Sequence, residues 1–181
     1  MARQIFQLRV SLVGVRPTVW RRVLVPGGYT LDRLHRVLQY ALGWRDCHLH
    51  SFDVDGVVYG VPDPVGELAV LDELDVRLDA VVGKGSRWRY TYDFGDWWEH
   101  DLLVEDVFVA DPDERYPICV DGERAGPPES AGGPSAYQVL LAAHADPGHP
   151  EHLVLRDWAG ERFDPAAFDA GRVTTLLRRL C

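Results

Sequence analysis

The chain has 181 residues and a formal net charge of −9, with 19 Lys and Arg against 28 Asp and Glu. This negative surplus repels nucleic-acid phosphates, so non-specific binding of DNA or RNA is disfavoured. Hydrophobic residues make up 46% of the sequence, yet no apolar run approaches the ~20 residues that a membrane span needs. The three cysteines show no close pairing, which favours a reducing compartment. We therefore expect a cytoplasmic protein with no membrane partner.

The first third of the chain contains two strand patterns and one helix pattern. Apolar and polar residues alternate over 6–12 and again over 19–25, which predicts an antiparallel hairpin. Leucine, valine and alanine then recur at helical spacing over 31–42. Thr30 is a candidate N-cap and Gly43 a candidate C-terminal stop, so this segment predicts an amphipathic helix.

Two further hairpins are predicted in the middle of the chain. Asp55-Gly56 lies between two extended segments and is a strong hairpin signal. Aromatic residues alternate with polar ones over 88–94, Gly95-Asp96 breaks the run, and a second extended run continues over 98–109. This pattern predicts two strands that meet at an acidic, aromatic corner.

The last third changes character after an irregular segment. Residues 111–133 lack periodicity but are rich in Cys, Asp and Glu, and ordered loops of this length are often functional. From residue 134 onward the pattern is helical, with a possible capping box at Ser135 and Gln138 and Pro150 at a helix start.

Together these patterns predict an α+β fold in one domain, residues 1–181. We expect an antiparallel sheet within 1–110, one long helix in the N-terminal half, a site loop over 111–133, and a helical C-terminal third over 134–181. The helices are expected to pack on the sheet, although the C-terminal third could also mediate an oligomer.

Four segments stand out when taken together: Trp20-Arg-Arg-Val-Leu-Val-Pro26, Leu42-Gly-Trp with His48-Leu-His50, Tyr92-Asp-Phe-Gly-Asp with Trp98-Glu-His100, and Tyr116 to Gly133 with Pro127-Pro-Glu129. In this order they resemble the plasmid pRiA4b ORF-3-like family, which is also labelled as insertion-element passenger proteins of TnpR-like type. The resemblance spans about residues 5–168 and implies an α+β fold, carriage on plasmids or mobile elements, and no defined chemistry. This chain departs from the family pattern at Gly126, where a cysteine is usual before Pro-Pro-Glu.

The favoured interpretation is a binding or accessory module with an aromatic, acidic groove. Three polar clusters, distant in sequence, would meet because the sheet brings them together, and a loop would cover them. The ligand would be an unidentified protein, peptide or small molecule, with no resident cofactor. The candidate binding residues are His48, His50, Asp93, Asp96, Trp98, His100, Asp121 and Glu129.

The alternative is a metal-dependent hydrolase built from the same segments. His50, His100 and Cys119 would hold a divalent metal such as zinc, and Asp96 or Glu129 would act as general base. Neither interpretation establishes that the protein is an enzyme, because the carboxylates and imidazoles could equally hydrogen-bond turn amides.

Three other interpretations are weaker. A cysteine nucleophile would need Cys119 beside an imidazole, and Cys47 next to His48 is interpreted as incidental. Ser11 superficially matches a serine-recombinase nucleophile, but it lies in an alternating strand. The basic residues between Arg16 and Arg22 would support nucleic-acid binding, yet charges on a strand edge also prevent aggregation.

Overall fold

The computed structural model describes residues 3–62 and 70–180. Within these residues, eight strands form a single sheet in the order β5-β4-β3-β6-β7-β1-β2-β8, accompanied by five α-helices. None of these helices is long and apolar enough to cross a bilayer. The strands are β1 (Gln4–Leu12), β2 (Trp20–Pro26), β3 (His50–Val54), β4 (Val57–Gly60), β5 (Val70–Asp72), β6 (Arg87–Tyr92), β7 (Trp98–Val109) and β8 (Ile118–Glu123). The helices are α1 (Leu31–Leu42), α2 (Leu78–Val81), α3 (Gly133–Ala145), α4 (His152–Ala159) and α5 (Ala170–Leu177), followed by the 3₁₀ turn η1 (Arg178–Leu180).

The predicted layout, an antiparallel sheet with one long N-terminal helix, is wrong. The sheet is mixed, because β4 and β5 pair in parallel while the other neighbouring strands run antiparallel. Among the described residues α1 does not stand out as the one long helix, since it has 12 residues and α3, in the C-terminal third, has 13. The parallel strand escaped prediction because β5 has three residues, too few to show a period.

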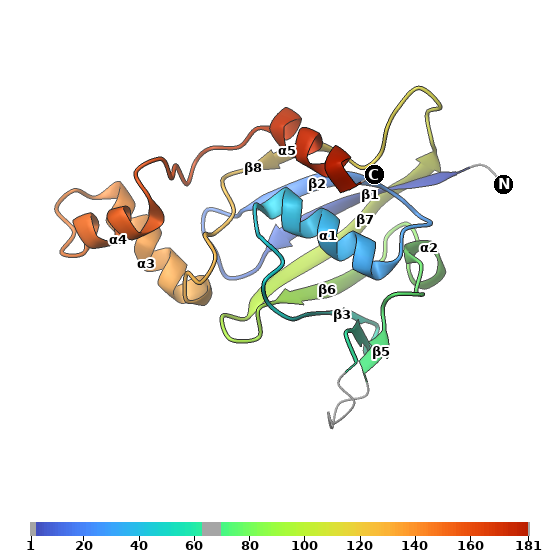
Figure 1. Cartoon of the computed structure of the whole chain (residues 1–181), viewed down its shortest axis with the longest axis horizontal. Coiled ribbons are helices and arrows are strands. Elements are labelled where there is room, and N and C mark those ends of the chain that lie inside the picture. Colours follow the sequence, from blue (N-terminus) through green and yellow to red (C-terminus); the bar gives the residue numbers. More distant parts are fainter. Residues whose placement is uncertain (1–2, 63–69, 181) are drawn as a thin grey trace.

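Helix α1 lies across the centre of one sheet face, and α5 lies beside it on the same face (Figure 1). Leu31, Leu34 and Leu38 of α1 are fully buried, as the helical spacing predicts. The helix ends at Gly43, whose φ of 89° is left-handed and therefore suits glycine. Helices α3 and α4 pack on each other at one end of the sheet rather than across it (Figure 1), so the helical third covers the sheet only in part.

A buried arginine links β2 to the C-terminal end of α1. The Nε atom of Arg21 donates to the carbonyl oxygen of Ala41 at 2.7 Å. Its Nη1 donates to the carbonyl oxygens of Trp20 at 2.8 Å and Glu123 at 3.0 Å. Burial lowers the pKa of Arg21 to about 10, so the group remains charged at neutral pH. The cation therefore meets the negative end of the helix dipole and joins three elements.

The irregular segment after β7 contains a strand that the sequence did not predict. Strand β8 pairs with β2 at the edge of the sheet, and its half-exposed residues give no clear alternation. Beyond it, the chain crosses the end of α1 in direct backbone contact. A Cβ atom added to Gly126 would lie 2.0 Å from the carbonyl oxygen of Leu42, so this crossing requires glycine.

Replacing Gly126 with alanine is expected to destabilise the fold. The new methyl group would overlap backbone atoms of α1, and overpacking of this kind costs about 1–3 kcal/mol. Gly83→Ala is the matched control, since nothing lies within 4 Å of its added Cβ, and it should stay within about 1 kcal/mol of wild type. Urea unfolding of both variants checks the prediction; equal stability would contradict it.

Candidate functional site

The turn between β6 and β7 is built on two aspartates. Asp93 Oδ1 accepts hydrogen bonds from the backbone N–H groups of Gly95 at 3.0 Å and Asp96 at 3.3 Å. Asp96 Oδ2 accepts from the N–H of Gly132 at 2.9 Å, which ties the turn to the start of α3. Each aspartate thus uses one carboxylate oxygen to accept hydrogen bonds from backbone amides. The Oδ2 atom of Asp93 is left for other contacts.

Side chains from three distant segments meet beside this turn. His48 Nε2 lies 3.5 Å from Asp93 Oδ2 and 3.9 Å from Glu129 Oε2. Two hydrogen bonds fix the Glu129 carboxylate: its Oε1 accepts one from the N–H of Arg45 at 2.7 Å and one from the Tyr92 hydroxyl at 3.2 Å. The sheet and the crossing loop therefore bring together three of the residues that the sequence analysis singled out.

Cys47 completes this arrangement. Its Sγ lies 3.7 Å from the Tyr92 hydroxyl, and its free side chain is exposed. One ligand atom each from Cys47, His48 and Glu129 lies within 4.8 Å of the other two, and the described part of the chain holds no other such group. We call these three residues the Cys47–His48–Glu129 cluster.

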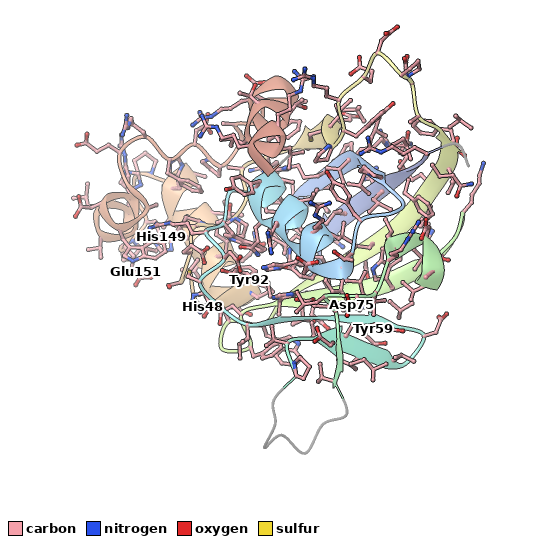
Figure 2. The ribbon with its side chains drawn as sticks, turned by 45° about the vertical axis from the view of Figure 1, so that its right-hand side comes forward. His48, Tyr59, Asp75, Tyr92, His149 and Glu151 are labelled. Atoms are coloured by element: carbon pink, nitrogen blue, oxygen red, sulfur yellow. The ribbon has the colours of Figure 1, made fainter. Side chains whose placement is uncertain are left out.

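Aromatic rings form the floor under the cluster. Tyr92 packs edge-on against His48 with ring centroids 5.7 Å apart, and the two lie side by side in Figure 2. Trp44 stacks on Tyr92 at 4.8 Å and donates from Nε1 to the carbonyl oxygen of Pro127 at 2.8 Å. Burial raises the pKa of Tyr92, so its hydroxyl keeps the proton that it donates to Glu129.

His50, in contrast, belongs to a separate buried network. Its ring stacks on that of His35 with centroids 3.4 Å apart, and its Nε2 lies 2.9 Å from both carboxylate oxygens of Glu73. His35 contacts Asp46 at 2.7 Å through Nε2 and the Tyr90 hydroxyl at 2.8 Å through Nδ1. Burial, and to a lesser degree His50, lower the pKa of His35 to about 4. These groups already have partners inside the fold.

His100 and Trp98 lie in the core. His100 has no solvent exposure, and its Nδ1 donates to the carbonyl oxygen of Tyr90 at 3.2 Å. Burial lowers its pKa to about 4, so the ring is neutral in the folded protein. Trp98 is 1% exposed, whereas its neighbour Trp97 is 54% exposed and contacts the ring of Phe94. Of this adjacent pair, Trp97 is therefore the one that can contact a partner.

Cys119 and Asp121 face other elements. The N–H of Cys119 donates to the hydroxyl of Thr174, which in turn donates to the Cys119 carbonyl oxygen, each at 3.0 Å. Burial raises the pKa of the Cys119 thiol to about 11, which opposes the thiolate that a nucleophile or metal ligand requires. Asp121 Oδ2 lies 3.0 Å from Arg22 Nη1. The trio expected to hold a metal, which also included His50 and His100, is not gathered at one point.

Sequence reasoning missed two members of the site. Cys47 was interpreted as incidental, although its position next to His48 was itself a signal of two adjacent metal ligands. Tyr92 fell within the alternating aromatic run and was indistinguishable there from a core residue. Tyr92 belongs to the site because its hydroxyl contacts Glu129, which lies 37 positions away in the sequence. No local sequence pattern predicts that contact.

The fold and site together define a protein with one mixed sheet, helices mainly on one face, and a mixed sulfur, nitrogen and oxygen cluster where the loop crosses α1. A family model described as plasmid pRiA4b ORF-3-like protein matches residues 4–172, and the chain belongs to that family. The expected association with insertion elements stays a prediction.

Two other proteins are similar to this chain over most of its length. An uncharacterised protein, y4hQ of Sinorhizobium fredii, is 40% identical over 170 residues, which cover 92% of this chain and 87% of the relative. The crystal structure of a protein of unknown function, MM3350 of Methanosarcina mazei, superposes with a TM-score of 0.87 at 31% identity. That comparison covers 94% of this chain and 98% of the other.

The buried His100 predicts a loss of stability in acid. Its pKa falls from 6.5 to about 4 on folding, so the unfolded chain takes up the proton first as the pH drops. The stabilisation is complete above the unfolded pKa and is lost as the pH falls through this window. When the pH is lowered from about 7 to about 5, the free energy of unfolding of the wild type should fall by on the order of 2 kcal/mol more than that of His100→Phe. Urea unfolding at both pH values checks this, and identical pH dependence would contradict it.

Asp96 is expected to act as a structural tie rather than as a general base. Asp96→Ala removes the acceptor of the Gly132 N–H and should lower the free energy of unfolding by about 1–2 kcal/mol. Asp96→Asn retains an acceptor oxygen and is the matched control, with a smaller loss. Thermal or urea unfolding measures both, and an equal loss in the two variants would refute the hydrogen-bond explanation.

Proposed function

We propose that this protein is a binding module that holds a divalent transition-metal ion, preferentially zinc, at the Cys47–His48–Glu129 cluster. The observation that carries the proposal is the convergence of one thiol, one imidazole and one carboxylate within 4.8 Å. Thiolate and imidazole ligands select zinc and related ions over magnesium and calcium, which prefer oxygen.

The cluster needs only a small adjustment to bind zinc. Ligand atoms around a tetrahedral zinc ion are about 3.5 Å apart, compared with separations of up to 4.8 Å here. Cys47 is exposed and the His48 side chain is 34% exposed, so rotation of these two side chains can close the gap. Glu129 is the fixed partner because Arg45 and Tyr92 both hold it.

Three protein ligands leave a fourth position of a tetrahedral zinc ion open to a further ligand. Asp93 Oδ2 lies 3.5 Å from His48 Nε2 and can fill this position or bind a water molecule held there. The exposed rings of Phe94 and Trp97 lie in the same turn as Asp93 and offer an apolar contact to a partner. The proposal is thus a metal-assisted binding site, with no substrate turned over.

Without a metal, the same geometry fits an ion pair of the His48 imidazole with the carboxylates of Asp93 and Glu129. The two arrangements differ in the role of Cys47. An ion pair between imidazolium and carboxylate makes no use of a thiol, whereas a metal site takes its thiolate as a ligand and releases the proton.

Cobalt titration of untagged protein tests the proposal, because a thiolate ligand gives Co²⁺ an intense charge-transfer absorption. We expect about one equivalent to bind, with zinc displacing cobalt, and affinity to fall in acid as the thiol and imidazole protonate. Cys47→Ser should abolish the charge-transfer band, and His48→Gln should weaken binding by about tenfold or more.

Cys119→Ser is the matched thiol control, since Cys119 is buried away from the cluster, and it should leave the spectrum unchanged. Binding of less than roughly a tenth of an equivalent, or a band that survives Cys47→Ser, would refute the metal site. The ion-pair arrangement would then remain as the explanation of the geometry.

A further inference from the structure

We propose that a second site, a pocket at the N-terminal end of α1, binds a small organic phosphate. The pocket has a volume of about 650 Å³, within the range of small-molecule sites. It lies between the start of β1, the turn after β2, the first turn of α1 and the start of α2, and Arg3, Arg33 and Arg77 line it.

The charge of this pocket is opposite to that of the chain. Three arginines face one carboxylate, Asp79, in a protein of net charge −9. Asp79 engages Arg77 through two contacts of 2.9 and 2.6 Å. Within the described residues, Arg3 and Arg33 form no ion pair, so two guanidinium groups keep their charge available. Guanidinium forks match phosphate oxygens in geometry as well as charge.

The remaining walls suit an uncharged organic group. The guanidinium carbon of Arg33 lies 5.1 Å from the centre of the Tyr29 ring, and Pro26 and Val109 provide apolar surface. The Arg77 guanidinium lies close to the backbone at Gly28, because its Nη2 would be 3.4 Å from a Cβ added there. Cationic and apolar walls together favour a phosphate ester over a bare inorganic ion.

Backbone hydrogen bonds hold the walls in place without a ligand. The N–H of Gly27 donates to the carbonyl oxygen of Gln4 at 2.8 Å, and the N–H of Asp79 donates to that of Gly27 at 2.9 Å. The N–H of Ala110 donates to the carbonyl oxygen of Arg3 at 2.8 Å. A pocket that is already formed loses little entropy when a ligand binds.

This pocket shares no residue with the proposed metal site. Helix α1 separates the two sites, because Arg33 lies in its first turn and the metal cluster follows its last. Its 12 residues place them about 18 Å apart along the helix axis. Failure of one proposal therefore leaves the other intact.

Calorimetric titration tests the pocket, with ATP, inorganic pyrophosphate and adenosine as probes and EDTA present to exclude metal bridging. We expect saturable ATP binding with a Kd below roughly 1 mM, weaker binding of pyrophosphate, and none of adenosine. Arg33→Ala and Arg3→Ala should each weaken ATP binding by about tenfold, and Arg33→Lys by less than Arg33→Ala.

Arg36→Ala is the matched control. Arg36 lies one turn further along α1, pairs with Asp32 and does not line the pocket, yet it carries the same charge. It should change the ATP affinity by no more than about twofold, as should Cys47→Ser. No saturable ATP binding, an equal effect of Arg36→Ala, or adenosine binding as tight as ATP would overturn the proposal. Pyrophosphate binding as tight as ATP would overturn its organic part.

Discussion

The direct backbone contact between Gly126 and the carbonyl of Leu42 determines where the candidate site forms. The segment that follows β8 packs directly on the end of α1 at this contact. Two hydrogen bonds then hold the segment in place. Trp44 Nε1 donates to the carbonyl oxygen of Pro127, and the N–H of Arg45 donates to the carboxylate of Glu129. Glu129 can approach His48 only because these contacts remove the freedom that a loop of this length would otherwise have.

Four histidines, of which three are buried and one is half-buried, illustrate how one residue type takes different roles. His100 is a neutral core residue, with desolvation as the main cause of its lowered pKa. His35 and His50 stack in a polar network in which each imidazole has a carboxylate partner. His48 alone stands near two carboxylates and a thiol with part of its ring exposed. Accessibility together with the nearness of other ligand atoms, and not the presence of an imidazole, distinguishes a candidate site.

Sequence patterns predicted the elements that have enough residues to show a period. Helix α1, the β1–β2 and β3–β4 hairpins, and the aromatic pair β6–β7 all lie where alternation or helical spacing placed them. The short edge strands β5 and β8 were missed, since three residues or a half-exposed face carry little periodicity. The parallel direction of β5 is a tertiary property, and no local signal could have specified it.

The site was predicted in part for the same reason. The expectation that the His48–His50 segment, the Asp93 turn and the loop before α3 would meet came from the predicted sheet. His48 itself precedes β3, and the pairing of β3 with β6 joins segments that no hairpin connects, so no local pattern encodes it. Which imidazole of the His48 and His50 pair would be accessible depended on the helix above it. His50 lies under α1 against His35, and Glu73 closes over it from a segment without regular pattern. Two of the basic residues between Arg16 and Arg22 make contacts within the fold, because Arg21 donates to the Ala41 carbonyl oxygen and Arg22 pairs with Glu105.

The placement of Thr174 over β8 has a consequence for how the protein behaves at high concentration. An edge strand normally offers its outward N–H and C=O groups to any passing chain, and this templating is a common route to aggregation. At Cys119 both groups already form hydrogen bonds with the Thr174 hydroxyl. Helix α5 therefore blocks strand addition to β8 at this residue. The opposite margin, β5, is only three residues long. Within residues 3–62 and 70–180, neither edge strand is longer than six residues, so neither presents a long open ladder for intermolecular pairing.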